Sequence, residues 1–363
     1  MEKMVRFRKE DLHDYVVRYL ERFSVPVRDA GIVADVLVAA DLRGIPSHGF
    51  IRLHSYYGQR LAHGHMNPQA ELKVVSETAT TLTFDGGNGL GQVAGHRAMT
   101  RCIEKADKAN VAVAVVHRSN HYGIAGYYAM MALEHGMIGA SLTNSHPLVA
   151  PTYGRTAAVG TNPISVAIPS GKEFPFVLDM ATSTVTIGRV TLHEKMGKPI
   201  PLGWGIDSAG ELTGDPLKIL GGRGALLPLG GADITSGYKG YGLGLLVDIL
   251  CATLSGGRNL TDVGGPDEAR ESDVSHLFAA LRIDAFRPLA AFAEQMDRMV
   301  ETLKNLPRME GQNRIFVAGE KEYEAVLQNE RLGVPVPEPA IAEIRREGEK
   351  AGIPFDLVPV PGN

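Results

Sequence analysis

Several features that are common in proteins are scarce in this chain of 363 residues, and each scarcity excludes a class of function. Its two cysteines, Cys102 and Cys251, belong to no CxxC or Cys/His pair, so we expect small buried side chains, no disulfide and no metal site. No apolar run approaches the roughly 18 residues that cross a membrane. Both signs of charge are interspersed, with a formal net charge of −4, and we expect neither a membrane nor a nucleic-acid partner.

The first residues contain no secretory signal. Residues 2–6, Glu-Lys-Met-Val-Arg, lead into a polar segment that reads as a helix, without the apolar core of a signal peptide. We therefore expect a cytoplasmic protein.

Glycine, in contrast, is abundant. The chain has 42 glycines, well above the usual share of about 7%. They cluster in residues 86–95, 221–244 and 256–265 without a repeating period. Such clusters indicate tight turns and close approach of the backbone to another group, for which a bound cofactor is the usual reason.

The periodicity of apolar residues predicts an α/β (α+β) protein with a central non-Rossmann α/β block, bracketed by helical segments at both ends. We divide the chain into a helical domain (1–70 and 289–363) and a central cofactor-binding domain (71–288). Helices are expected at 29–42, 93–108, 126–134, 241–254, 289–306, 320–329 and 338–350, with a first helix that starts near residue 9. Strands are expected at 72–75, 80–84, 111–116, 138–142, 164–168, 176–178 and 278–283.

The segment 89–94, Gly-Leu-Gly-Gln-Val-Ala, fits the dinucleotide fingerprint G-x-G-x-x-A between a strand and a helix. A Rossmann unit also needs an acidic residue at the end of the next strand, to hold the ribose hydroxyls. That strand ends at residues 115–118, Val-Val-His-Arg, which contain no carboxylate. We therefore interpret 89–94 as a glycine-rich turn and reject a standard Rossmann domain.

A Ser-His pair lies where Gly44 and Pro46 interrupt a helical pattern, and an arginine follows it. If a helix restarts near Gly49, Arg52 lies one turn beyond His48. A guanidinium can then hold a substrate carboxylate while the imidazole exchanges a proton with the oxygen on the neighbouring carbon. The alternative is a helix-capping Ser47 with a solvated His48 and a surface Arg52.

Six ordered motifs between residues 9 and 335 resemble the type-2 malate/L-lactate dehydrogenase family. The resemblance implies a non-Rossmann fold, NAD or NADP as the cofactor, and hydride transfer between that nucleotide and a small 2-hydroxy or 2-oxo acid. The motifs are 40–49 (Ala-Asp-Leu-Arg-Gly-Ile-Pro-Ser-His-Gly), 119–126 (Ser-Asn-His-Tyr-Gly-Ile-Ala-Gly), 143–145 (Thr-Asn-Ser), 160–163 (Gly-Thr-Asn-Pro), 178–183 (Leu-Asp-Met-Ala-Thr-Ser) and 227–231 (Leu-Pro-Leu-Gly-Gly), the last followed by 237–243 (Gly-Tyr-Lys-Gly-Tyr-Gly-Leu).

The resemblance also implies roles for individual residues. His48 corresponds to the acid/base, with Ser47 and Asp179 as its relay or orienting partners. His121 corresponds to a second active-site histidine, so either His48 or His121 can be the proton acceptor. Arg52 corresponds to the clamp on the substrate carboxylate, and Thr161 to a second substrate contact. The implied cofactor positions are Asn120, His121, Tyr122, Gly123, Ser145, Asp179, Met180, Ala181, Lys239, Ala318, Gly319 and Glu320.

Two of these residues also have plain structural interpretations. Asp179 can cap a helix or turn that starts at Met180, and Lys239 can be a solvated lysine between two glycines. From the resemblance, the helical ends and the Pro-containing segment 336–339, we expect a homodimer.

The sequence leaves other functions open. The same clamp and fold can serve a reductase of cyclic imino acids or of diketo sugar acids, and malate, lactate, sulfolactate and ureidoglycolate all fit the expected substrate class. A nucleotide-binding regulatory protein that has lost the chemistry is the alternative outside enzymes.

Overall fold

The computed structural model describes residues 4–172, 174–222 and 224–361. Seven strands of the described chain form one sheet in the order β2-β3-β4-β10-β5-β6-β7. Strands β3 and β4 pair in parallel, and the other neighbouring pairs are antiparallel. A Rossmann sheet is mostly parallel, so the predicted mixed α/β fold without a standard Rossmann domain is confirmed. The strands are β2 (Lys73–Glu77), β3 (Thr81–Asp85), β4 (Val111–Ser119), β5 (Met137–Thr143), β6 (Ile164–Ile168), β7 (Phe176–Met180) and β10 (Val274–Arg282).

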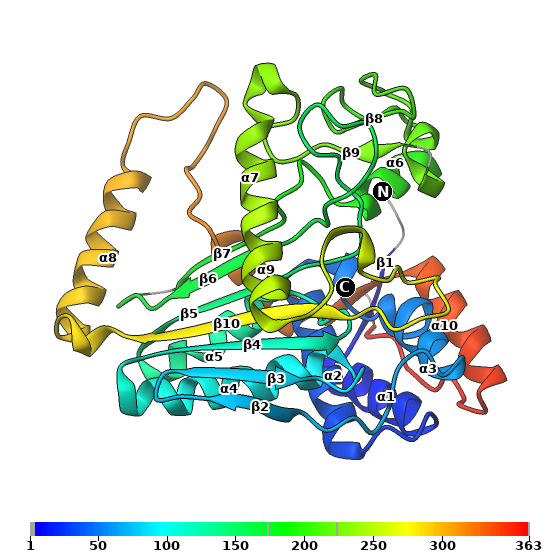
Figure 1. Cartoon of the computed structure of the whole chain (residues 1–363), viewed down its shortest axis with the longest axis horizontal. Helices are drawn as coiled ribbons and strands as arrows, with labels where there is room; N and C mark the ends of the chain where they lie inside the picture. Colours follow the sequence, from blue (N-terminus) through cyan, green and yellow to red (C-terminus); the bar gives the residue numbers. More distant parts are fainter. Residues whose placement is uncertain (1–3, 173, 223, 362–363) are drawn as a thin grey trace.

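Strand β4 shows why its segment is apolar without interruption. Side chains of a strand alternate between the two faces of a sheet. Ala112, Ala114 and Val116 pack in the cluster that contains helices α4 (Gly91–Ala109) and α5 (Ala125–Met131). Val115 packs in the cluster of helix α7 (Gly237–Asp248) and its π-helical continuation Ile249–Thr253. Both faces of the sheet centre are therefore covered (Figure 1).

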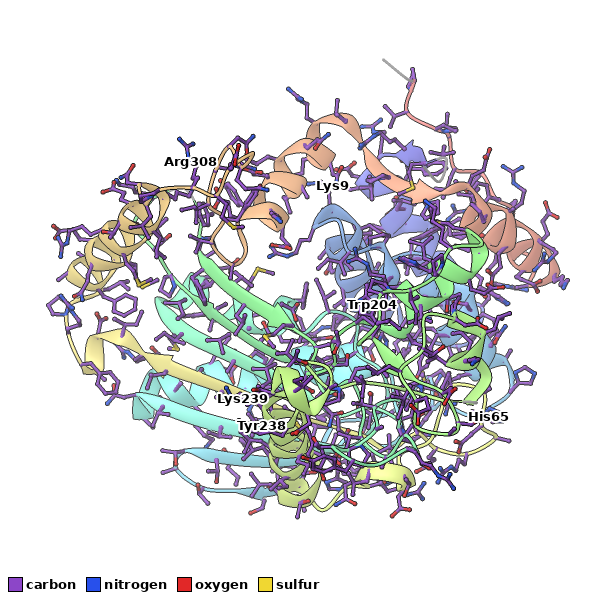
Figure 2. All side chains as sticks on the ribbon, turned by 90° about the horizontal axis from the view of Figure 1, so that it is seen from above. Lys9, His65, Trp204, Tyr238, Lys239 and Arg308 are labelled. Atoms are coloured by element: carbon purple, nitrogen blue, oxygen red, sulfur yellow. The ribbon has the colours of Figure 1, made fainter. Side chains whose placement is uncertain are left out.

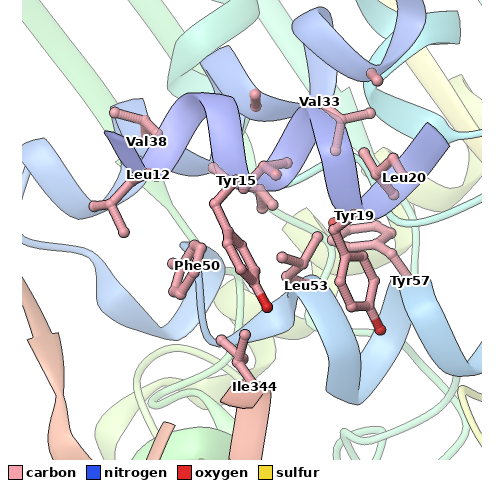
Figure 3. Close-up of a cluster of buried hydrophobic side chains, with 14 of the residues drawn as sticks. Leu12, Tyr15, Tyr19, Leu20, Val33, Val38, Phe50, Leu53, Tyr57 and Ile344 are labelled. Atoms are coloured by element: carbon pink, nitrogen blue, oxygen red, sulfur yellow. The ribbon is translucent and has the colours of Figure 1, made fainter. Parts of the chain in front are cut away.

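The helices of the two chain ends share one hydrophobic core. Helices α1 (Lys9–Glu21) and α2 (Val27–Leu42) pack against α10 (Glu338–Lys350), and Figure 3 shows Tyr15 and Phe50 beside Ile344 from α10. A two-stranded sheet of β1 (Met4–Phe7) and β11 (Val334–Pro337) joins the ends. The helix-like segment expected after residues 2–6 is α1, whereas strand β1 was not expected, because its strand partner lies at the other end of the sequence.

Helix α8 (Leu289–Lys304) lies far from α10, at the opposite end of the large sheet (Figure 1). The division into domains 1–70 with 289–363 and 71–288 stays a prediction. No helix in the described part of the chain is long and apolar enough to cross a membrane. The remaining elements are α3 (Gln59–Ala62), α6 (Ile187–Lys195), α9 (Glu320–Leu332), β8 (Gly205–Ile206), β9 (Ala225–Leu226), the π-helix Leu53–Gly58 and 3₁₀ turns at Pro46–His48, Leu133–His135, Pro216–Lys218, Leu220–Gly222, Asp233–Thr235, Leu260–Asp262 and Ile283–Ala285.

Candidate active site

A buried carboxyl group holds the turn that follows α2 in place. Asp41 is 2% exposed, and its Oδ2 accepts a hydrogen bond of 2.7 Å from the backbone N–H of Phe50. A side chain at Gly49 would overlap this carboxylate, so only glycine fits there. The chain turns helical again close to the expected position, because the backbone N–H of Arg52 donates to the Gly49 carbonyl at 2.9 Å and the π-helix begins at Leu53.

The same turn brings Ser47, His48 and Arg52 together. The Ser47 hydroxyl lies 2.9 Å from His48 Nδ1, and Arg52 Nε donates to the Ser47 carbonyl at 2.7 Å. Burial, followed by the positive charge of Arg52, lowers the pKa of His48 to about 4. The imidazole is therefore neutral at pH 7 and can accept a proton.

His121 lies on the turn after β4 and faces His48. The two rings are 5.4 Å apart between centroids and 27° from parallel. The Tyr57 hydroxyl lies 2.7 Å from His121 Nδ1. Burial lowers the pKa of His121 well below its usual value, and the neighbouring His48 and Arg52 lower it further. Nε2 of His48 and of His121 has no hydrogen-bond partner among the described residues.

These side chains line one pocket with a volume of about 360 Å³, which also contains Ser145 and Thr161. The Ser145 hydroxyl accepts a hydrogen bond of 3.1 Å from the backbone N–H of Thr161 and lies 3.4 Å from the Thr161 hydroxyl. An expected cofactor contact and an expected substrate contact are thus adjacent. The pocket lining also includes Tyr56, Tyr122, Gly123, His146, Leu148, Pro163, Ile187, Gly188, Gly264, Pro266 and Asp267.

One wall of the pocket, residues 264–267, is held by a buried arginine. Arg60 is 1% exposed, and its guanidinium donates to five backbone carbonyl oxygens at 2.8–3.4 Å. Among the residues that the structure describes, no carboxylate forms an ion pair with it. The acceptors are the carbonyls of His65, Gly265, Pro266, Glu268 and Arg270.

Asn120 and Tyr122 support the pocket from behind. The Asn120 amide is fully buried and donates to Asn88 Oδ1 at 3.0 Å and to the Gly89 carbonyl at 2.9 Å. A side chain at Gly91 would overlap the Asn120 carbonyl, so this glycine permits close packing of α4 on the 120–121 backbone. The buried Tyr122 stacks on His276 with 4.5 Å between ring centroids.

Asp179 is not placed beside His48 by any contact in the described chain. Its Oδ2 accepts a hydrogen bond of 2.8 Å from the backbone N–H of Gly126. Although solvent reaches the side chain, surrounding protein atoms displace much of its hydration and raise its pKa to about 6, opposed by the Gly126 N–H and by Arg43. The hydrogen bond to the first turn of α5 gives Asp179 a structural role. The role of Asp179 as a partner of His48 stays a prediction.

Two of the expected cofactor segments meet at the edge strand β7. The backbone N–H of Val177 donates to the Ala318 carbonyl at 3.1 Å, which places the 318–320 turn beside the strand that carries Asp179 and Met180. Ala181 follows directly. Glu320 is buried and accepts from Lys304 Nζ at 2.6 Å.

Lys239 lies elsewhere, near the start of α7. It is exposed, with its Nζ 5.9 Å from the centre of the Tyr238 ring (Figure 2). The pocket lining does not include it, and the solvated interpretation of this lysine suits its position.

Sequence reasoning missed Tyr56, Tyr57, His146 and Arg60. Tyr56 follows Arg52 at the same i+4 spacing by which Arg52 follows His48, and His146 adjoins the expected Ser145, so both carried a local signal. Tyr57 contacts His121 and Arg60 contacts Gly265, and both partners are distant in the sequence. No local pattern therefore identifies Tyr57 or Arg60.

Residues 7–345 match the malate/L-lactate dehydrogenase family. The malate dehydrogenase of Pyrococcus abyssi is 44% identical, over 97% of this chain and 96% of its own. The L-sulfolactate dehydrogenase of Methanocaldococcus jannaschii is 38% identical, over 85% of this chain and 86% of its own. The solved malate dehydrogenase of Entamoeba histolytica superimposes with a TM-score of 0.93 at 34% identity, over 98% of this chain and 100% of that one. The chain therefore belongs to the malate/L-lactate dehydrogenase family and is a pyridine-nucleotide-dependent oxidoreductase of 2-hydroxy acids.

Proposed function

We propose that the enzyme oxidises 2-hydroxy acids that carry a second anionic group, with malate as the first candidate and sulfolactate as the second. The position of Arg52 carries the 2-hydroxy-acid chemistry, because its guanidinium lines the same pocket as the stacked His48 and His121, whereas the second anionic group is inferred from relatives. The names of two relatives, a malate and an L-sulfolactate dehydrogenase, support the substrate class.

Arg52 holds the substrate carboxylate in this proposal. Its Nε is occupied by the Ser47 carbonyl, while its two terminal amino groups have no hydrogen-bond partner among the described residues. These two groups form the planar fork that pairs with a carboxylate by parallel charge-assisted bonds. Thr161 and Ser145 provide hydroxyl groups to the same pocket.

The histidine pair handles the proton of the substrate's C2 oxygen. In both rings Nδ1 lies beside a hydroxyl, from Ser47 or Tyr57, and Nε2 is available. Because burial keeps both rings neutral at pH 7, either can accept the C2 hydroxyl proton as the carbonyl forms. His48 is the acid/base in our proposal, and His121 is the second imidazole at the same oxygen.

The residues of the pocket fit a pyridine nucleotide. Leu148, Pro163 and Ile187 offer an apolar wall for an aromatic ring, and the Ser145 hydroxyl offers a polar contact beside it. When bound, the nicotinamide exchanges the hydride with C2 of the substrate. The segments 179–181 and 318–320 and Lys239 stay the proposed positions for the rest of the nucleotide.

Either NAD or NADP is compatible with this proposal. Arg118 is one candidate partner for the 2′-phosphate of NADP, but it pairs with Asp85 at 2.9 Å and with Glu271 at 3.4 Å. Arg189 instead is exposed, with its guanidinium carbon 5.8 Å from the centre of the Trp204 ring. NADP preference would therefore depend on Arg189 rather than on Arg118.

A homodimer in the cytoplasm completes the proposal. Large apolar side chains along α7 and its continuation are exposed, including Leu246 at 46%, Ile249 at 53% and Leu254 at 60%. An apolar row of this kind supports an interface between copies of the chain. Both cysteines are buried and free, as expected from the sequence, which suits a reducing compartment.

The proposal is tested with oxaloacetate, 3-sulfopyruvate, pyruvate and a cyclic imino acid, each with NADH and with NADPH. The nicotinamide absorbance measures the reaction rate. We expect the highest kcat/KM for oxaloacetate or 3-sulfopyruvate and a much lower value for pyruvate. Preference for pyruvate would contradict the second anionic group, and preference for the imino acid would favour a reductase of that class. Nucleotide binding without turnover on any substrate would favour a regulatory protein.

A further inference from the structure

The pocket contains a third histidine, His146, which the proposed proton transfer does not use. Its two ring nitrogens have no hydrogen-bond partner among the described residues, and neither nitrogen is sealed from solvent by protein atoms. In His48 and His121, by contrast, Nδ1 already lies beside a hydroxyl. The half-buried ring of His146 is therefore free to receive a group of the substrate.

Hydrogen bonds hold the backbone on both sides of His146. Asn144 lies two residues before it, and its amide donates to Asp248 Oδ1 at 2.9 Å. Two residues after it, the backbone N–H of Leu148 donates to the Val159 carbonyl at 2.9 Å. The segment that carries the imidazole is thus anchored at both ends, which favours a fixed position of the ring in the pocket.

Charged and titratable neighbours act on His146. Burial lowers the pKa of His146, and the carboxylates of Glu268 and Asp267 oppose this change. The positive charge of Arg52 lowers the pKa further. His146 is also among the neighbours that add to the effect of burial on the pKa of His121. The free ring is therefore mostly neutral at pH 7, and an anion that binds beside it favours its charged form.

A second anionic group on the substrate needs a cationic partner of its own. In the proposed function Arg52 holds the carboxylate next to C2, and His48 and His121 lie at the C2 oxygen. Among the described residues that line the pocket, His146 is the one remaining side chain that can carry a positive charge. Asp267 is the one carboxylate in the same lining, and it would repel a second anion beside a neutral ring. A proton on His146 offsets this repulsion.

We propose that His146 is a specificity-determining residue, which takes up a proton from solvent as it binds the second carboxylate or the sulfonate of the substrate and releases that proton when the product leaves. This inference rests on the proposed preference for substrates with a second anionic group. It assigns that preference to one residue of this chain.

The test is a ratio: kcat/KM for 3-sulfopyruvate, or for oxaloacetate, divided by kcat/KM for pyruvate at the same pH. All three substrates use the nicotinamide, Arg52 and the histidine pair, so the ratio isolates the second anionic group. In the wild-type enzyme we expect the ratio to fall as the pH rises from about 5 to about 8, because His146 loses its positive charge. The sulfonate of 3-sulfopyruvate stays ionised throughout this range, so such a fall belongs to the enzyme.

His146→Gln keeps a hydrogen-bond donor but cannot become charged. We expect it to lower the ratio by about 10- to 100-fold at the acidic end, as the loss of one charge-assisted hydrogen bond would. The ratio in this variant should also no longer depend on pH.

Asp267→Asn is a second variant, in which His146 stays in place. The fall of the ratio should move to lower pH, because Asp267 opposes the lowering of the His146 pKa by burial. His135→Gln is the matched control. His135 is exposed in the turn Leu133–His135 and does not line the pocket, so its replacement should leave the ratio unchanged at every pH.

Three outcomes would overturn the inference while the proposed function stands. They are a wild-type ratio in His146→Gln, an equal loss for pyruvate and for the two larger substrates, and a ratio in the wild-type enzyme that does not change with pH. A wild-type ratio below one would refute the proposed preference itself and the inference with it. Measurement of the wild-type enzyme alone therefore separates the two failures.

Discussion

Replacement of Arg52 by lysine examines the substrate clamp directly. Arg52 Nε is already bonded to the Ser47 carbonyl at 2.7 Å, so two terminal amino groups remain for a carboxylate. Lysine presents one ammonium group, without the fork and without the bond to Ser47. The loss of one charge-assisted hydrogen bond costs about 1.5–3 kcal/mol, and this corresponds to a KM that is roughly 10- to 100-fold higher.

Steady-state kinetics with each 2-oxo acid should show this rise in KM, while the dissociation constant of NADH or NADPH, followed by nucleotide fluorescence, stays nearly unchanged. Arg22→Lys is a suitable control, because Arg22 Nε also donates to a backbone carbonyl, that of Ala351, on an exposed part of the helical layer. An unchanged KM in Arg52→Lys, or an equal loss of nucleotide affinity, would remove Arg52 from the substrate site.

Three further predictions concern acid/base chemistry, stability and assembly. In wild-type enzyme, kcat/KM for hydroxy-acid oxidation should rise with pH through one ionisation below 6.5, because burial lowers the pKa of His48 to about 4. This limb should disappear in His48→Ala and survive with lower amplitude in His121→Ala, and the reverse pattern would make His121 the acid/base. Burial raises the pKa of Asp41 to about 8, above about 3.9 in the unfolded chain, so the folded state loses stability as pH rises between these values. Asp41→Asn should therefore have a Tm that increasingly exceeds that of wild type from pH 5 to pH 8, measured by thermal unfolding, and a gap independent of pH would refute the argument. Light scattering at micromolar concentration should give twice the chain mass of 39.0 kDa, and the mass of one chain would exclude the homodimer.

Local patterns in the sequence predict most of the sheet and of the long helices. The expected strand 164–168 coincides with β6, and the apolar run 111–116 lies within β4, where burial on both faces leaves a clear signal. The short strand β1 and helix α6 were missed. Strand β1 depends on pairing with Val334–Pro337, a contact that no local window contains.

The candidate site shows the same division between local and distant effects. Ser47, His48 and Arg52 meet through one turn, so their association was predictable from spacing. His121 joins them because β4 ends beside that turn. Its partner Tyr57 depends on how the helical layer packs against the sheet, and the sequence contains no pattern for this contact.

The support of the pocket wall by Arg60 has a consequence for how such enzymes diversify. Arg60 binds carbonyl oxygens, which every residue provides, so the hold on residues 265–270 does not depend on which side chains this segment carries. Asp267, which lines the pocket, can therefore be exchanged while the backbone of the wall keeps its place. A guanidinium also stays charged throughout the physiological pH range. Substrate preference can thus evolve by substitutions in this wall without a new scaffold, in a family whose members are named for malate and for L-sulfolactate.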